Sequence, residues 1–165
     1  MKKYEFTGET KEIRLLFRTA TLHRIRATVA FGIVEVGDLG GWIEKEENLS
    51  HEGKAWVCGD AKVWGNAKVC GDAEVCGDAE VFSASHVLVI GAIGSRNDFT
   101  TFYRDKDNEI TVKCGCFLGK IDRFLEKVTQ THGDSKYALV YRAAVEVAKL
   151  QIDLSGEAPK DADEE

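Results

Sequence analysis

The stretch AWVCGDAKVWGNAKVCGDAEVCGDAEVFSASHVLVI, residues 55–90, repeats with a period of six residues. Valine recurs at positions 57, 63, 69, 75, 81 and 87, and alanine or serine stands two residues before each valine. Gly-Asp or Gly-Asn follows the valine four times. A short fixed period predicts a repeat architecture, in which each unit buries its apolar face only by stacking on the next.

The six-residue unit has the pattern of one side of a triangular coil. Strand side chains alternate between two faces, so each valine and the alanine two residues before it point the same way, into the coil. The Gly-Asp or Gly-Asn pair supplies a corner, because both Gly and Asn tolerate the positive φ of tight turns. Three sides of six residues close a coil of 18 residues, and coils stack about 4.8 Å apart. We therefore expect residues 18 apart in sequence to lie above one another.

The position after each valine is expected to point outward. It holds Cys58, Trp64, Cys70, Cys76, Phe82 and Leu88. Contiguous exposed apolar surface usually marks an interface. The sequence therefore predicts a homo-oligomer interface, most simply of a trimer, at Trp64, Phe82, Cys70 and Leu88. The alternative is that other parts of the same chain cover these columns.

Composition restricts the class of protein. The chain has 165 residues, a formal net charge of −6 and a pI near 5.3, which argues against nucleic acid as the main partner. It has no run of 18 apolar residues, and its start, MKKYEFTGETKEI, lacks a signal-peptide hydrophobic region, so no membrane association is expected. We predict a cytoplasmic protein. Its five cysteines are expected to be reduced thiols without disulfides.

The pattern changes along the chain predict four parts. Residues 1–36 read as N-terminal β-strands that form a cap, and residues 37–94 as the repeat. Residues 95–154 read as a small α+β domain, and the acidic residues 155–165 as a disordered tail. The overall fold class is mainly β.

Within the α+β part, two strands and two helices are expected. Phe99 to Arg104 and Ile110 to Cys116 read as strands joined by a polar turn. Apolar residues at positions 121, 124, 125 and 128 then follow helical spacing, and Gly133 ends that helix. A second helix buries a stripe that includes Tyr141, Ala144 and Ala148. The order is therefore β-β-α-α.

The combination GDLGGWIEKEENLS at 37–50 and AWVCGDAKVWGNAKV at 55–69 resembles phage- and prophage-encoded hexapeptide-repeat proteins. The resemblance covers roughly residues 4–90. It implies a short left-handed parallel β-helix, and the handedness rests on the resemblance alone. Such proteins often carry a transferase label that itself rests on the fold, so the resemblance implies no particular chemistry.

His86 is the candidate base of the hexapeptide acyltransferase alternative. Such enzymes typically use an imidazole at a subunit interface, with acetyl-CoA lying along the prism. The repeat here supports only about two regular coils, a prism on the order of 15 Å tall and short for CoA. His86 also takes the outward slot that holds Lys or Glu in other blocks, so a solvated surface position is the simpler expectation.

Cys114-Gly115-Cys116 and the later His132 are a weak candidate metal site. Structural zinc prefers four ligands, commonly from C-x2-4-C pairs. The spacer here is one residue and no second pair follows. Two small buried side chains are the simpler expectation, and no metal or other cofactor is predicted.

The polar residues just after the repeat are the candidate ligand site. They are Ser95, Arg96, Asn97, Asp98, Thr101, Tyr103 and Arg104. They follow the end of the repeat, and domain junctions are favoured ligand sites. Arg96 has the planar fork that binds phosphate or carboxylate. The alternative is a structural Arg96–Asp98 pair that joins the two domains.

The sequence favours a non-enzymatic, oligomeric binding protein. On this hypothesis it binds a host protein or sequesters a small anionic ligand such as a nucleotide, and thereby counters a host defence. The setting is an analogy to the phage-type resemblance. The alternatives are a trimeric acyltransferase with His86 as base and a structural phage component.

Overall fold

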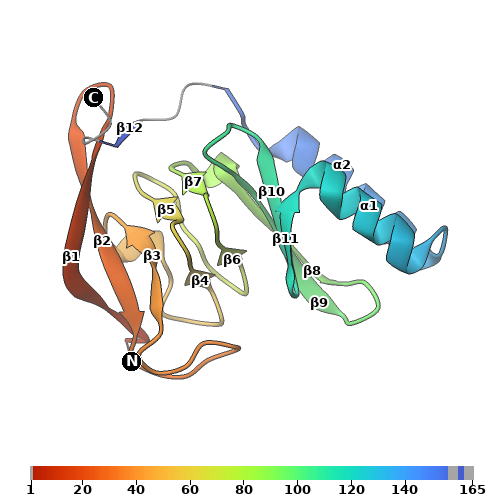
Figure 1. Ribbon diagram of the computed structural model, residues 1–165, viewed down its shortest axis with the longest axis horizontal. Coiled ribbons are helices and arrows are strands. Elements are labelled where there is room, and N and C mark those ends of the chain that lie inside the picture. Colours follow the sequence, from red (N-terminus) through yellow and green to blue (C-terminus); the bar gives the residue numbers. More distant parts are fainter. Residues whose placement is uncertain (1, 156–159, 162–165) are drawn as a thin grey trace.

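The computed structural model describes residues 2–155 and 160–161 and shows a mainly β protein with two C-terminal helices (Figure 1). Three sheets are present among these residues: a mixed six-stranded sheet, an antiparallel four-stranded sheet and a parallel pair. Short strands of the repeat lie in the middle of the molecule, between an N-terminal hairpin and the four-stranded sheet.

The N-terminal hairpin consists of β1 (Tyr4–Arg14) and β2 (Thr19–Ala27), which pair antiparallel. Their register shifts between Phe6 and Thr10, around Gly8. Strand β3 (Leu39–Ile43) pairs antiparallel with β2 and parallel with the repeat, so it connects the hairpin to the repeat. The prediction of strands through residue 36 was wrong at its end, because Ile33 and Val36 are exposed in a loop that holds only an isolated bridge between Phe31 and Val34.

The repeat forms two-residue strands with the predicted 18-residue register. They are β4 (Trp56–Val57), β5 (Lys62–Val63), β6 (Glu74–Val75) and β7 (Glu80–Val81). Parallel pairing aligns Val57 with Val75 and Val63 with Val81. The preceding turn of chain is longer, since Ile43 aligns with Val63 and Leu49 with Val69. Ile43 and Leu49 are six positions apart, as in the regular blocks, so the two extra residues lie between Leu49 and Val57, after the 3-10 turn Glu46–Asn48.

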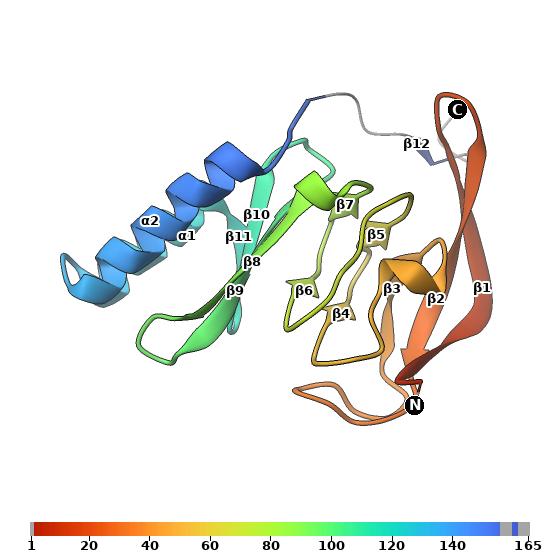
Figure 2. The ribbon, with the colours of Figure 1, turned by 180° about the vertical axis from the view of Figure 1, so that it is seen from behind.

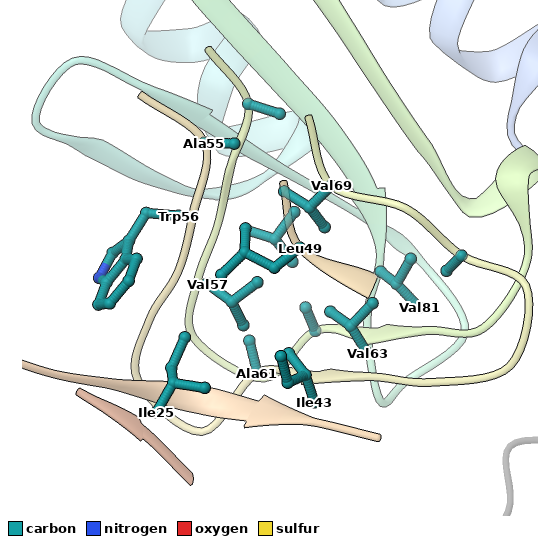
Figure 3. Close-up of a cluster of buried hydrophobic side chains, with 14 of the residues drawn as sticks. Ile25, Ile43, Leu49, Ala55, Trp56, Val57, Ala61, Val63, Val69 and Val81 are labelled. Carbon is teal, nitrogen blue, oxygen red and sulfur yellow. The ribbon is translucent and has the colours of Figure 1, made fainter. Parts of the chain in front are cut away.

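The valines and alanines of the repeat point inward, as predicted. Val57, Val63, Val75 and Val81 are each fully buried. Figure 3 shows Val57, Val63 and Val81 gathered with Ile43 and Leu49 in the interior, with Ile25 of β2 closing one side. The strands of the repeat are short, and β5 and β7 belong to the same sheet as the antiparallel hairpin. The described residues therefore show stacked parallel pairs and no continuous solenoid sheet.

The four-stranded sheet begins earlier than the sequence suggested. Its strands are β8 (Val87–Ile93), β9 (Asp98–Arg104), β10 (Ile110–Cys114) and β11 (Phe117–Lys120), in the order β11-β10-β9-β8. The sixth block of the repeat is therefore strand β8. Its side chains alternate: Val87 and Val89 pack on the repeat, and Leu88 and Ile90 pack on the helices.

The predicted helices are present as α1 (Ile121–His132) and α2 (Lys136–Gln151). They lie on the face of the four-stranded sheet that points away from the repeat, as both Figure 1 and Figure 2 show. Phe124 and Val128 of α1 and Ala144 and Ala148 of α2 are buried against that sheet. Neither helix of the described chain is long and apolar enough to cross a membrane.

Side chains of β9 close the C-terminal end of the repeat, which faces the four-stranded sheet. The last short strands have main-chain groups with no further strand to pair with, and such groups are costly to bury unpaired. Tyr103 donates its O–H to the carbonyl of Cys76 (2.9 Å) and accepts from the Cys76 N–H (3.3 Å). The Thr101 hydroxyl accepts from the Glu74 N–H at 3.0 Å.

The N-terminal end of the repeat is closed in the same way by residues that precede β1 or begin it. Lys3 Nζ donates to the Ala55 carbonyl at 2.6 Å, and the Tyr4 hydroxyl donates to the Leu49 carbonyl at 2.7 Å. Burial lowers the pKa of Lys3 to about 8. Strand β2 pairs with β3 along the third side. Residues outside the repeat therefore satisfy its open edges at both ends.

The predicted outward interface is largely covered by the chain itself. Trp64 is 2% exposed and packs with Ile13, Leu22 and Trp42 under the N-terminal hairpin. Phe82 stacks on Trp64 with ring centroids 4.8 Å apart. Of the four predicted interface residues, only Cys70 is exposed. Stacking of Trp64 on Phe82 was predicted correctly. Trp64 is not an exposed interface residue because β1–β2 cover it, whereas Phe82 and Leu88 remain partly exposed.

The prediction of five free thiols was also wrong. A disulfide joins Cys58 to Cys76, whose Cα atoms lie 4.5 Å apart because the 18-residue register stacks them. Cys70, Cys114 and Cys116 are free. The predicted disordered tail, 155–165, lies mostly outside the described residues. Within it Lys160–Asp161 form β12, which pairs antiparallel with β1.

Candidate functional site

The structure divides the predicted ligand cluster into two groups. Thr101, Tyr103 and Arg104 face the repeat and are buried, so the assignment of these three to a ligand site was wrong. Thr101 and Tyr103 bond to the main chain of the repeat, as described above. They form the junction between the two halves of the molecule, which the sequence had placed at Arg96 and Asp98.

Arg104 has a structural role at this junction. Its side chain is fully buried, with Nε donating to Asn108 Oδ1 at 2.8 Å and Nη1 donating to the Glu80 carbonyl at 3.1 Å. The guanidinium lies 5.1 Å from the centre of the Phe82 ring. Burial lowers the pKa of Arg104, and the nearby carboxylates of Glu80 and Asp105 oppose that shift.

His86 is buried, so the prediction that it lies on a solvated face was wrong. The chain leaves the repeat at Ser83 and forms a 3-10 turn, Ala84–His86, which turns the imidazole inward. His86 is 3% exposed, and its Nδ1 accepts from the Phe82 N–H at 3.1 Å. Burial, followed by the positive charge of Arg104, lowers the pKa of His86. A base that is held this way cannot reach a substrate across a subunit interface.

The remaining predicted residues meet at one hollow, which we name the Cys114 hollow. It has a volume of about 200 Å³ and lies between the β8–β9 turn, the β10–β11 turn and both helices. Its polar lining is Ser95, Arg96, Asp98, Cys114, Cys116, Lys127, Thr131, His132 and Tyr141. The two weak sequence candidates, Ser95–Asp98 and Cys114/Cys116/His132, are therefore parts of the same site. Asn97 is not part of the lining; it occupies the turn with φ of 48°.

Cys114, which lines this hollow, has two hydroxyl groups as neighbours. Thr100 Oγ1 donates to the Cys114 sulfur at 3.3 Å. Burial, followed by charge repulsion and a hydrogen bond with Cys114, raises the pKa of Tyr141 to about 12. The Tyr141 ring also stacks on His132, with centroids 5.8 Å apart.

Gly94 makes room for the Tyr141 phenol. Its φ is +80°, and a Cβ at this position would lie 1.8 Å from the Tyr141 hydroxyl oxygen. No larger side chain fits without moving Tyr141. The turn between β8 and β9 therefore contributes Arg96 to the lining of the hollow and also packs against the phenol.

The charge of the hollow is opposite to that of the whole chain. Its lining includes the cations Arg96 and Lys127 and the titratable His132, against the single carboxylate of Asp98. Among the described residues no ion pair joins Arg96 to Asp98, and Asp98 instead accepts from the Phe99 N–H at 2.7 Å. The alternative of a structural Arg96–Asp98 pair between the two domains is not what the geometry shows.

Metal binding is not favoured at this site. Cys114, Cys116 and His132 all line the hollow. Nevertheless, within residues 2–155 no three His, Cys, Asp or Glu side chains are grouped closely enough to hold a metal ion together. The hollow is better suited to an anion than to a cation.

A second hollow, of about 410 Å³, lies on the other side of Asp98. Phe31 and Trp56 supply aromatic walls, with ring centroids 5.3 Å apart. Its carboxylates, from Asp38, Glu74 and Asp98, outnumber its cations, from Lys54 and Lys113. The Lys113 ammonium also lies 3.6 Å from Glu74. This hollow is therefore a poorer site for an anion than the Cys114 hollow.

The sequence did not identify Lys127 or Tyr141 as site residues. Tyr141 was predicted only as part of a buried helical stripe, and Lys127 lies one position before the buried Val128. A helical period shows which side of a helix is buried but not which loop that side meets. Comparison with protein-family models and with curated proteins finds no match for this chain.

Gly94→Ala is expected to disturb the Cys114 hollow specifically. The added methyl group displaces Tyr141, so the pKa of the phenol falls from about 12 towards its ordinary value near 10, as followed by phenolate absorbance at 295 nm. A folded-state pKa above the unfolded value means that Tyr141 stabilises the fold below pH 10. That contribution is lost as the pH rises from about 10 to 12.

Gly71→Ala is the matched control. Gly71 has φ of +65° but nothing within 4 Å of an added Cβ. Gly71→Ala should therefore cost only the backbone strain of an alanine in this conformation, about 1–2 kcal/mol, without steric overlap. Gly94→Ala should cost at least about 1 kcal/mol more in urea unfolding because of the steric overlap. Equal losses, with an unchanged phenol titration, would contradict the packing described.

Proposed function

We propose that this chain is a non-enzymatic binding protein that holds a small anion in the Cys114 hollow. The observation that supports this most directly is the excess of basic side chains there, in a chain whose formal net charge is −6. Arg96 and Lys127 reach the hollow from different segments, a turn and a helix. Arg96 presents several N–H donors to a phosphate or carboxylate, and Lys127 supplies a point charge.

The size of the hollow limits the ligand. Pockets for drug-sized ligands measure roughly 300–1,000 Å³. A volume of about 200 Å³ suits inorganic phosphate, a small carboxylic acid or the phosphate end of a nucleotide. A nucleotide would place its phosphate beside Arg96 and leave its base outside. The second hollow, with Trp56 and Phe31, lies across Asp98 from it.

The biological setting follows from the phage-type resemblance. A chain that sequesters a small anion in a host cell would counter a defence that uses that anion as a signal. This part of the proposal places the protein in the cytoplasm.

We also propose that residues 37–86 form a short left-handed parallel β-helix. The support is the 18-residue register of the valine pairs and their inward side chains. The predicted range, 37–94, is shortened because Val87–Ile93 belong to the antiparallel sheet. The turn sense would be visible directly in an experimental structure.

The anion proposal predicts selective loss of binding in Arg96→Ala. Inorganic phosphate or succinate, added at constant ionic strength, should raise the thermal midpoint of the wild-type chain, because a ligand that binds only the folded state stabilises it. Removing the guanidinium should weaken binding about tenfold or more, the usual worth of charged hydrogen bonds.

Arg123→Ala is the matched control for this experiment. Arg123 lies on the same helix as Lys127 but is exposed and is not part of the hollow's lining. It should bind phosphate and succinate like the wild type. Equal binding by Arg96→Ala and Arg123→Ala would show that any anion effect is non-specific and would remove the basis of the proposal.

We further propose that copies of the chain associate through α2, with three copies the expected number. Helix α2 carries an exposed apolar stripe, Leu139, Ala143, Val147 and Leu150, whose spacing of four, four and three residues keeps it on one face. Leu150 is 89% exposed. This stripe replaces the Trp64 column as the candidate interface, because Trp64 is covered within the chain.

Leu150→Glu is expected to dissociate the assembly, as measured by light scattering at high micromolar concentration. A carboxylate buried in an apolar contact must lose its hydration without gaining a partner. Leu16→Glu is the control, since Leu16 is 88% exposed but lies at the tip of the β1–β2 hairpin. A monomeric wild-type chain would contradict the proposed association through α2.

A further inference from the structure

Of the three free cysteines, Cys114 and Cys116 line the hollow, and Cys114 has in addition Thr100 and Tyr141 beside its sulfur. It is partly exposed at the end of β10 and lines the hollow, so a small molecule can reach it. Its sulfur accepts from Thr100 at 3.3 Å and interacts with the Tyr141 phenol. Cys70 is exposed but lines neither of the two hollows described above. The Cys114 sulfur therefore has two hydroxyl groups, of Thr100 and Tyr141, as its neighbours.

The charges around Cys114 select which reagents would approach it. Arg96 and Lys127 line the same hollow of about 200 Å³ as the sulfur. The Arg96 Nη1 atom lies 3.9 Å from where a Cβ on Gly115 would be, so the guanidinium is close to the residue that follows Cys114. An electrophile that carries a carboxylate would be held by these cations with its remaining atoms beside the sulfur.

We propose that Cys114 is a modification site for small carboxylates that carry an electrophilic carbon, such as α,β-unsaturated acids. In this step the Cys114 thiol loses its proton to solvent. The sulfur then forms a bond to the β-carbon of the acid, and the carbon–carbon π pair moves to the α-carbon, which takes a proton from water. The whole acid is added and nothing leaves, so no oxidant or other co-reactant is needed. The inference rests on the anion-binding proposal, because the same cations hold the carboxylate.

The test compares two alkylating reagents of nearly equal size, iodoacetate and iodoacetamide, which differ in charge. With either reagent the thiolate sulfur bonds to the CH₂ carbon and iodide leaves. The rate at each cysteine is measured by peptide mass spectrometry on the full chain, and Cys70 serves as the internal reference. The ratio of the iodoacetate rate to the iodoacetamide rate should be about tenfold higher at Cys114 than at Cys70, the effect expected when cations assist one reagent only.

Variants separate the contributions of charge and of hydroxyl neighbours. Arg96→Ala should bring the rate ratio at Cys114 down to that at Cys70, whereas Arg123→Ala should leave it unchanged. Thr100→Val keeps the shape of the buried side chain but removes its hydroxyl, so both reagents should react more slowly at Cys114 with the ratio preserved. Far-UV circular dichroism checks that each variant is folded.

The outcomes distinguish this inference from the proposal on which it rests. If Cys114 reacts with both reagents no faster than Cys70, the modification site is overturned, while phosphate binding by the thermal assay still stands. That binding should persist in Cys114→Ser, because the cations remain. If Cys114 reacts quickly but shows the same rate ratio as Cys70, the preference for carboxylates is overturned. Failure of phosphate binding in the wild type would remove the anion site itself.

Discussion

Hydrogen bonds from side chains to open main-chain edges hold the two ends of the repeat, and the rest of the structure depends on them. A stack of short parallel strands satisfies its internal N–H and C=O groups but leaves a row of them at each end. Lys3 and Tyr4 donate to carbonyls at the N-terminal end of the repeat. Thr101 and Tyr103 form hydrogen bonds with the main chain of Glu74 and Cys76 at the C-terminal end of the repeat. The N-terminal strands and the four-stranded sheet are therefore the caps that a repeat of this length needs.

The strand that closes the repeat also builds the candidate site. Side chains of β9 alternate, so Tyr103 faces the repeat while Thr100 contacts Cys114 on the adjacent strand. The helices that cover the second face of the sheet bring Tyr141 and Lys127 to the same place. Strand β9 therefore both closes the repeat and helps to form the Cys114 hollow. The anion and thiol proposals both depend on the position of this strand.

The sequence predicted what depends on local pattern. The valine period predicted the 18-residue register, and with it the stacking of Trp64 on Phe82 and of Cys58 on Cys76. It failed where distant segments meet. Trp64 was expected at an interface but lies under the N-terminal hairpin, and His86 was expected on the surface but turns inward after Ser83. Arg96 was found as a candidate because its residue type is informative. Tyr141 was not, since a phenol on a buried helix face has no sequence signature of function.

Native-state hydrogen exchange of the amides of Glu74 and Cys76 tests the role of β9 most directly. These amides lie at the open edge of the last short strands, and their acceptors are side-chain oxygens of Thr101 and Tyr103, at 3.0 and 3.3 Å. If those side chains close the repeat, both amides should exchange only through global opening, as slowly as the amides in the middle of the four-stranded sheet. Exchange as fast as that of an exposed turn amide would show that the edge is open to water and would contradict the account.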